Sequence, residues 1–376
     1  MEIDPAVPHG STNSRRSAAE RSERRAPAAP EQRGPGVELL RRLQAGHAFN
    51  PSPRHDQLYA VHVPFDELTG SHGCEAALER ALRQGRRVAL VGASGTGKSS
   101  VTEHVLGPLT EGLAPLRVPV TMERSAVATD PIEFARHLVT LVGRWVDVGL
   151  PQRSRDAAGL APARRGASSH KVSVAPAWML AKVELAYELS QAASQEAPTS
   201  TQVVEQAQGL FDLIRGDELT PVVVLDDTDR WLSTSWQPDN PGVRAAFFGR
   251  VVRVLAEELD VSAVVAVHPT YLTDVDYQAS AGFLDTTLHV PQVPDAAAVG
   301  RILHRRTAED LGVERDDLFT APALAVLFEH YRHAPNIRRR LLLIANAALT
   351  LAVDAGADRI DREHCIAAIT QENLTD

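Results

Sequence analysis

A glycine-rich segment near residue 95 carries the clearest chemistry in the sequence. It matches the phosphate-loop pattern G-x-x-x-x-G-K-[ST] in full. Glycines at these spacings let backbone N–H groups turn inward around phosphate oxygens, and the following helix start adds free donors and a favourable dipole. We expect Lys98 to reach the β- and γ-phosphates of a nucleotide and the Ser99 hydroxyl to bind Mg²⁺. The expected nucleotide-binding residues are Gly92, Ala93, Ser94, Gly95, Thr96, Gly97, Lys98, Ser99 and Ser100.

The alternative reading of this segment is a glycine-rich turn that binds no ligand. An apolar run precedes the segment and a helical pattern follows it, which is the context that a phosphate loop requires. The sequence also holds only three lysines against 36 arginines, a bias typical of a GC-rich bacterial genome. A lysine retained against that bias at position 98 indicates a chemical requirement.

A second candidate site lies at the end of the apolar run 221–225, where Asp226 and Asp227 follow directly. An apolar strand that ends in acids beside a phosphate loop fits a Walker B site. We expect Asp226 to hold Mg²⁺ through water and Asp227 to orient or deprotonate the attacking water. The alternative is that these acids merely cap the following turn, and Asp229 and Arg230 are as well explained by mutual pairing or by capping the next helix.

Strands alternate with helices around both motifs. Apolar runs predict strands at 87–91, 116–122, 221–225, 261–267 and 288–290, and helical periodicity predicts helices at 37–44, 75–82, 131–148, 177–193, 201–215 and 243–258 and after Gly97. Residues 50–64 are punctuated by proline and are expected to be extended, and 150–175 are expected to form a loop. This alternation indicates an α/β fold, a parallel sheet covered by helices on both faces.

The composition divides the chain further. Residues 1–36 mix proline, serine and both charges without apolar periodicity and are expected to be a disordered tail. Residues 37–292 form the expected nucleotide-binding domain, with a helical or loop insertion at about 150–215. From 293 to 376 only helices are predicted, with starts after Asp295 and Asp361, so a small all-α lid domain is expected to end the chain.

Composition excludes several classes of protein. No run reaches the roughly 18 apolar residues of a membrane helix, and no apolar run follows Met1, so we expect a cytoplasmic protein without membrane contact. Its two cysteines, Cys74 and Cys365, are too few for a disulfide scaffold or a cysteine zinc site. The net charge of −9 argues against indiscriminate nucleic-acid binding, although Arg301, Arg305 and Arg306 allow a local DNA-binding patch.

Taken together, these motifs resemble those of AAA+ P-loop ATPases, in the group that holds replication-initiator, origin-recognition, transposition-regulator and related signalling NTPases. The stretch 65–70 with its following helix resembles the segment that cups adenine, and the helical end resembles the AAA+ lid. The resemblance covers about 55–370. It implies His268 as the sensor-1 residue, with Thr270 in reserve, and Arg338 as the sensor-2 residue. Structural roles remain open for His268 and for the basic run 338–340.

Two features depart from that family. The usual catalytic glutamate is replaced by Asp227, which is one methylene shorter. The stretch 271–287, where ring-forming members present an arginine finger, contains neither arginine nor lysine. The finger must then come from elsewhere on the chain (Arg244, Arg250 or Arg253) or from a partner, or turnover is weak.

The expected function is therefore a Mg-ATP-dependent ATPase whose nucleotide state drives a core–lid movement and assembly as a homo-oligomer or with a protein partner. The rival expectation is a weakly hydrolysing ATP-dependent switch or scaffold that recruits an effector. Either is compatible with a DNA-associated component of a mobile element or defence system. A small-molecule kinase would share the phosphate loop but fits the helical C-terminal region and the paired aspartates less well.

Overall fold

The computed structural model describes residues 35–51, 55–70, 73–107, 111–118, 125–149, 200–232, 240–312, 315, 317–333 and 337–373. The predicted tail up to residue 34, the loop at 150–175 and the helix at 177–193 lie outside the described residues. Of those described, none lies in a helix both long enough and apolar enough to cross a bilayer.

Five parallel strands form the central sheet, in the order β2-β3-β4-β1-β5. The strands β1 and β3 that carry the two motifs are not neighbours, because β4 lies between them. Four strands fall where apolar runs predicted them, whereas β2 starts three residues earlier than expected. Their bounds are β1 Arg87–Val91, β2 Leu113–Arg117, β3 Thr220–Leu225, β4 Ser262–Val267 and β5 Thr286–His289.

Alternate residues of each inner strand pack against two separate hydrophobic cores. Val88 and Leu90 of β1 face a core that includes the helices α4 (Cys74–Arg83) and α5 (Lys98–Val105). Ala89 and Val91 face the opposite core, which holds α7 (Pro131–Gly149) and α10 (Ser200–Gly216). Because both faces are covered, the inner strands β1, β3 and β4 are buried over nearly their whole length, as predicted for a parallel sheet, whereas the edge strand β5 is only partly buried.

The helix α10 packs against α7 and β3 and buries Phe211 completely. It therefore belongs to the helical cover of the sheet. Asp130 caps the start of α7, since its carboxylate accepts a hydrogen bond from the Ile132 N–H at 2.8 Å. The short helix α6 (Ser125–Thr129) precedes α7 and packs against it.

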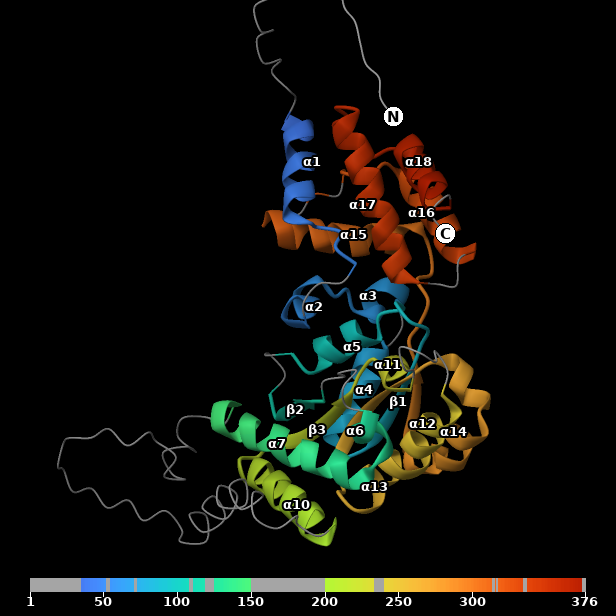
Figure 1. Cartoon of the computed structure of the whole chain (residues 1–376). Coiled ribbons are helices and arrows are strands. Elements are labelled where there is room, and N and C mark those ends of the chain that lie inside the picture. The colour runs from blue at the N-terminus through green and yellow to red at the C-terminus, as the bar shows by residue number, and fades with distance from the viewer. Residues whose placement is uncertain are drawn as a thin grey trace, which may run out of the picture.

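The segment before the phosphate loop is more helical than expected. It contains α1 (Pro35–Gly46), α2 (His55–Val61) and α3 (Phe65–Thr69), so the prediction of extended structure over 50–64 was wrong for α2. Proline at 51, 53 and 64 led to that prediction, but α2 fits between these prolines. α1 packs against the C-terminal helices, while α2 packs against α5 and against α15 (Ala296–Leu311), as Figure 1 shows.

One long helical segment lies between β3 and β4. It changes from α-helix to π-helix and back to α-helix. It runs as α12 (Pro241–Ala246), a π-helical turn (Phe247–Val252) and α13 (Arg253–Glu257). The position of the helix predicted at 243–258 is thus confirmed. Before it lies the short helix α11 (Thr228–Leu232), and after β4 come the 3₁₀ turns Pro269–Thr273 and Ala281–Phe283 around α14 (Val275–Ser280).

The C-terminal part is all helical in its described residues, apart from a single bridge between Phe319 and Ile360. It comprises α15 (Ala296–Leu311), α16 (Ala321–His333), α17 (Arg338–Asp354) and α18 (Arg362–Asn373). Asp295 caps α15 through the Ala298 N–H at 2.7 Å, as predicted, and Gly312 ends the helix with φ of 68°. These helices lie above the sheet domain in Figure 1, with α2 and α3 between the two parts.

Candidate functional site

The phosphate loop leads from the end of β1 into α5 and wraps around Lys98. The Lys98 Nζ donates hydrogen bonds to the backbone oxygens of Gly92 at 2.6 Å and Ala93 at 3.2 Å. The Thr96 hydroxyl donates to the same Ala93 oxygen at 2.8 Å and so closes the turn. These bonds hold the lysine against its own loop, buried at 7% exposure, at the carboxyl edge of the sheet.

Two glycines of the loop adopt backbone angles that other residues avoid. Gly95 has φ of 80° and Gly97 has φ of 105°. A Cβ atom at Gly95 would also lie 2.7 Å from the Ile337 side chain, because the start of α17 presses directly on the loop. The Arg339 N–H donates to the Gly95 oxygen at 3.2 Å. The helical lid is therefore joined to the phosphate loop through backbone as well as side chains.

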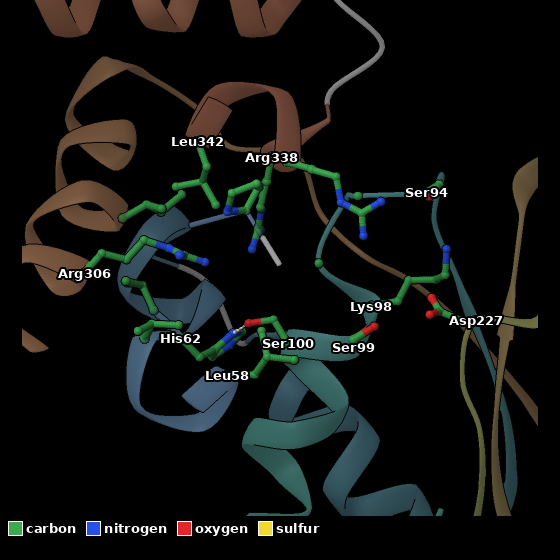
Figure 2. A pocket seen from close by; sticks show the side chains of 17 residues that line it. Leu58, His62, Ser94, Lys98, Ser99, Ser100, Asp227, Arg306, Arg338 and Leu342 are labelled. Carbon is green, nitrogen blue, oxygen red and sulfur yellow. Dashed lines mark hydrogen bonds between the residues drawn. The ribbon is translucent and has the colours of Figure 1, made fainter. Parts of the chain in front are cut away.

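A cavity of about 280 Å³ lies between the loop, the segment around α2, and the lid. Figure 2 shows Lys98 and Asp227 at one end of it and His62 and Arg306 at the other, with Arg338 and Leu342 above. Six of the nine predicted nucleotide-binding residues line the cavity, and Gly92, Ala93 and Thr96 shape the loop behind it. The lining comprises Pro51, Leu58, Val61, His62, Val63, Ser94, Gly95, Gly97, Lys98, Ser99, Ser100, Asp227, Ile302, Arg306, Arg338, Arg339 and Leu342.

The two predicted Walker B acids follow β3 with different orientations. Asp227 has φ of 49°, an uncommon angle for a non-glycine residue, and lines the cavity. Asp226 instead accepts a hydrogen bond from the Asp227 N–H at 2.8 Å. Burial lowers the pKa of Lys98, and the carboxylates of Asp229, Asp226 and Asp227 counteract that effect. Asp229 therefore acts on Lys98 together with Asp226 and Asp227. From the sequence, ion pairing with Arg230 or helix capping explained Asp229 equally well.

His268 ends β4 where the sensor-1 residue was expected, but its ring serves a local turn. Its Nδ1 accepts a hydrogen bond from the Thr270 N–H at 3.3 Å and lies 2.8 Å from the Thr270 hydroxyl. Neither residue is among those that line the cavity. In this arrangement His268 caps the following 3₁₀ turn, which is the structural alternative that the sequence left open.

Arg338 reaches into the cavity from the first turn of α17. Its guanidinium lies over the Phe65 ring, 4.2 Å from the centroid. Its Nε and Nη2 atoms are buried without a hydrogen-bond partner, and burial lowers its pKa. Unpaired buried donors are costly, so the site suits an anionic ligand at this position. Arg339, for which the sequence left a structural role open, also lines the cavity.

The wall of the cavity formed by His62 was not predicted from the sequence. His62 stands there with its Nε2 at 2.8 Å from the Glu75 carboxylate and its Nδ1 at 2.7 Å from the Ser100 hydroxyl. Glu75 accepts a further hydrogen bond from the Phe65 N–H at 3.1 Å. The only hint in the sequence was the position of Glu75 at the head of a predicted helix, since His62 stood in a stretch without periodicity.

The three lid arginines proposed as a DNA-binding patch are instead bonded to the chain itself. Arg301 donates to the Leu68 oxygen at 3.0 Å, Arg305 to the Ala60 oxygen at 2.9 Å and Arg306 to the Asn50 oxygen at 2.7 Å. Burial lowers the pKa of Arg306 to about 10. These hydrogen bonds attach α15 to the segment around α2 and α3. Arg306 is buried, whereas Arg301 and Arg305 stay exposed at the surface.

The candidate arginine fingers also differ in their surroundings. Arg244 forms an ion pair with Asp274 at 2.9 Å and packs near the Tyr271 ring. Arg253 pairs with Glu257 one turn along its helix. Arg250 is exposed on the π-helical turn and lines a separate hollow with the start of α7. Of the three, Arg250 is thus the best placed to reach another molecule.

The strand order, the phosphate loop and the acids after β3 together define the fold of a P-loop NTPase with a helical lid. No family model matches the chain, and no curated protein matches it. Among solved structures, Aeropyrum pernix ORC1 in complex with DNA is similar at 18% identity and a TM-score of 0.47, covering 82% of this chain and 66% of that one. The chain thus spans just under two thirds of the length of that protein.

Two further structures give similar values. Aeropyrum pernix ORC2 in ADPNP–ADP complexes shares 14% identity at a TM-score of 0.47, covering 84% of this chain and 71% of that one. Drosophila ORC bound to DNA shares 13% identity at a TM-score of 0.44, covering 94% of this chain and 70% of that one. The resemblance to origin-recognition AAA+ ATPases that the motifs indicate stays a prediction.

Proposed function

We propose that the chain binds Mg-ATP between its α/β core (37–292) and its helical lid (293–376) and hydrolyses the γ-phosphate. The observation that carries this proposal is the buried Lys98, held by its own loop in a cavity that Asp227 and Arg338 also line. A cation, an acid and unpaired guanidinium donors converge there on a space next to a helix N-terminus. This combination suits a phosphate chain and the water that attacks it.

Each residue has a proposed role in that chemistry. Lys98 and the N–H groups of residues 92–100 neutralise and hold the phosphates. Asp226 and the Ser99 hydroxyl supply hard oxygen donors, which suit Mg²⁺, and the metal would neutralise charge that develops on the phosphates. Asp227 orients the attacking water. Arg338 senses the phosphates from the lid, while His268, the earlier sensor-1 candidate, supports the neighbouring turn.

The contact between the phosphate loop and the lid can couple nucleotide binding to the position of the lid. Ile337 and Arg339 touch Gly95, so a phosphate that fills the loop changes the surface against which α17 rests. We propose that nucleotide state alters the angle between core and lid, and with it the surface presented to a second copy or to a cytoplasmic protein partner. The proposed partner is a protein, because the net charge of −9 does not favour DNA binding.

The substitution Lys98→Ala tests the nucleotide site itself. It removes the phosphate cation, so titration calorimetry with Mg-ATP should show a loss of affinity of at least 100-fold. The matched control is Lys98→Arg, which keeps the charge but cannot occupy the loop in the same geometry and should be intermediate. Undiminished affinity in Lys98→Ala would remove the proposed site.

A specific observation favours the rival function of a weakly hydrolysing switch. Two of the three candidate fingers, Arg244 and Arg253, are engaged in ion pairs, and a missing finger costs about 10³ to 10⁵ in rate in related GTPase systems. ATP turnover measured across protein concentration, with mass from light scattering, separates the two functions. Turnover that rises with oligomer formation supports the ATPase, and Arg250→Ala should then abolish the rise. A monomer that binds ATP without turnover supports the switch.

A further inference from the structure

The wall of the nucleotide cavity contains a hydrogen-bonded chain of three side chains from three elements. Glu75 lies at the head of α4, His62 follows α2, and Ser100 is in the first turn of α5, next to Ser99. The distances are 2.8 Å from the Glu75 Oε1 to the His62 Nε2 and 2.7 Å from the His62 Nδ1 to the Ser100 Oγ. Figure 2 shows the bond between His62 and Ser100 at the edge of the cavity.

The direction of these hydrogen bonds follows from the groups themselves. A carboxylate only accepts, so the His62 Nε2 must carry the proton that bonds to Glu75. Burial lowers the pKa of His62, against the opposing influence of Glu75, and thus favours a neutral ring. In a neutral ring with Nε2 protonated, Nδ1 is an acceptor, and Ser100 must donate its hydroxyl proton to it.

Glu75 remains ionised in this setting. Burial alone would raise its pKa, but hydrogen bonds from the His62 ring, its own backbone N–H and the Phe65 N–H outweigh that effect and lower the pKa. The ring that it holds is also confined. His104 lies against one side at a centroid distance of 4.6 Å, and Phe65 meets the ring edge at 6.4 Å. His62 therefore keeps both nitrogens on their present partners.

Ser100 lines the cavity beside Lys98 and Ser99. A serine hydroxyl has a single proton and can donate it to only one acceptor. We propose that His62 is a positioning residue that holds the Ser100 hydroxyl proton and so withholds one hydrogen-bond donor from the phosphates of a bound nucleotide. The inference rests on the proposed nucleotide site and adds a residue that limits its affinity.

Because His62 holds the Ser100 proton, the chain should bind nucleotide more weakly than it would with that hydroxyl free. A charge-assisted hydrogen bond to phosphate is worth roughly a factor of ten in binding. Removing the acceptor at position 62 frees the Ser100 proton for the phosphate, and the affinity rises by that factor. Removing the hydroxyl while His62 is present changes little, because the phosphate never received that donor.

A double-mutant cycle on the full chain tests the proposal, with Mg-ATP titrated by calorimetry at pH 8. His62→Phe should bind about tenfold more tightly than the original chain. Ser100→Ala keeps the backbone N–H that the loop presents to the phosphates and loses only the hydroxyl, so it should bind within twofold of the original chain. The double variant should lose the gain of His62→Phe. His62→Asn is the matched control: it retains an acceptor oxygen near the place of Nδ1 and should keep the original affinity.

Two results would contradict the proposed role of His62. A loss of fivefold or more in Ser100→Ala alone would show that the hydroxyl already donates to the ligand and would overturn the proposal, even if His62→Phe failed to fold. A folded His62→Phe with unchanged affinity would also overturn it. Lys98→Ala distinguishes a failure of the proposed nucleotide site from a failure of the proposed role of His62. If Lys98→Ala retains its affinity for Mg-ATP, the nucleotide site itself is wrong. If Lys98→Ala and Ser100→Ala both lose affinity, only the role of His62 is wrong.

Discussion

At the scale of single residues, the site combines charges that would repel or cost energy without a ligand. Lys98 bonds to its own loop, and Arg338 keeps two buried donors unpaired above the same cavity. Asp227 occupies a backbone angle that aspartate tolerates better than most residues but that still carries strain. Strain and unpaired donors at one place are typical of a site shaped for binding rather than for stability.

The role of Asp227 gives a residue-scale prediction. Asp227→Asn preserves the shape but removes the charge that orients water, so Mg-ATP should still bind within about threefold. Turnover, measured by phosphate release, should fall about 10² to 10⁴-fold, the usual contribution of a general base. Asp229→Asn, two residues further on, is the control and should keep most of the turnover. Equal losses in both variants would assign the water to the acidic cluster as a whole.

At the scale of elements, the contact between the phosphate loop and α17 is the joint on which the proposed movement depends. It is built on glycine, since Gly95 and Gly97 both leave room for residues of the lid. The segment of α2 and α3 forms the other joint, where backbone oxygens accept bonds from the arginines of α15. Core and lid are thus connected on both sides of the cavity.

Alanine substitutions at two glycines should change the free energy of unfolding in opposite directions. Gly95→Ala introduces a Cβ at φ of 80° and within 2.7 Å of Ile337, so it should lower the free energy of unfolding by about 1–3 kcal/mol and weaken Mg-ATP binding. Gly209→Ala lies inside α10 with open space around it and should raise the free energy of unfolding by about 0.5–1 kcal/mol. Urea denaturation measures both values, and a neutral Gly95→Ala would show that the lid yields to the loop.

At the scale of the whole molecule, stability should depend on pH through buried histidines. Burial lowers the pKa of both His62 and His104 from 6.5. Below pH 6.5 the unfolded chain therefore takes up protons that the folded chain does not, and the free energy of unfolding falls as the pH falls toward the lowered pKa values. Above pH 6.5 these two histidines no longer contribute to the slope.

Thermal unfolding between pH 8 and pH 5.5 tests this expectation. The midpoint temperature should decrease over the lower half of that range, and His62→Asn should show a shallower decrease because one of the two groups no longer titrates. Its absolute stability is not the readout, since the substitution also changes packing. An identical slope in the variant would mean that His62 is as easily protonated in the folded protein as in the unfolded chain.

The sequence by itself determined the chemistry that lies on one continuous stretch. A phosphate loop needs only its local turn and the helix that follows, so residues 92–100 could be placed from their spacing, and the order of apolar runs was enough to predict a parallel sheet. The cap at Asp295 was also local and was predicted correctly.

The tertiary structure alone decided which distant residues meet. His62, Glu75 and Ser100 are brought together by three separate elements, and no periodicity marks a histidine that packs between helices. Likewise, Arg301, Arg305 and Arg306 form a basic cluster in the sequence, but backbone oxygens more than 200 residues away accept their hydrogen bonds. Spacing along the chain specifies local turns and helix faces, whereas partners across the cavity depend on how core and lid pack.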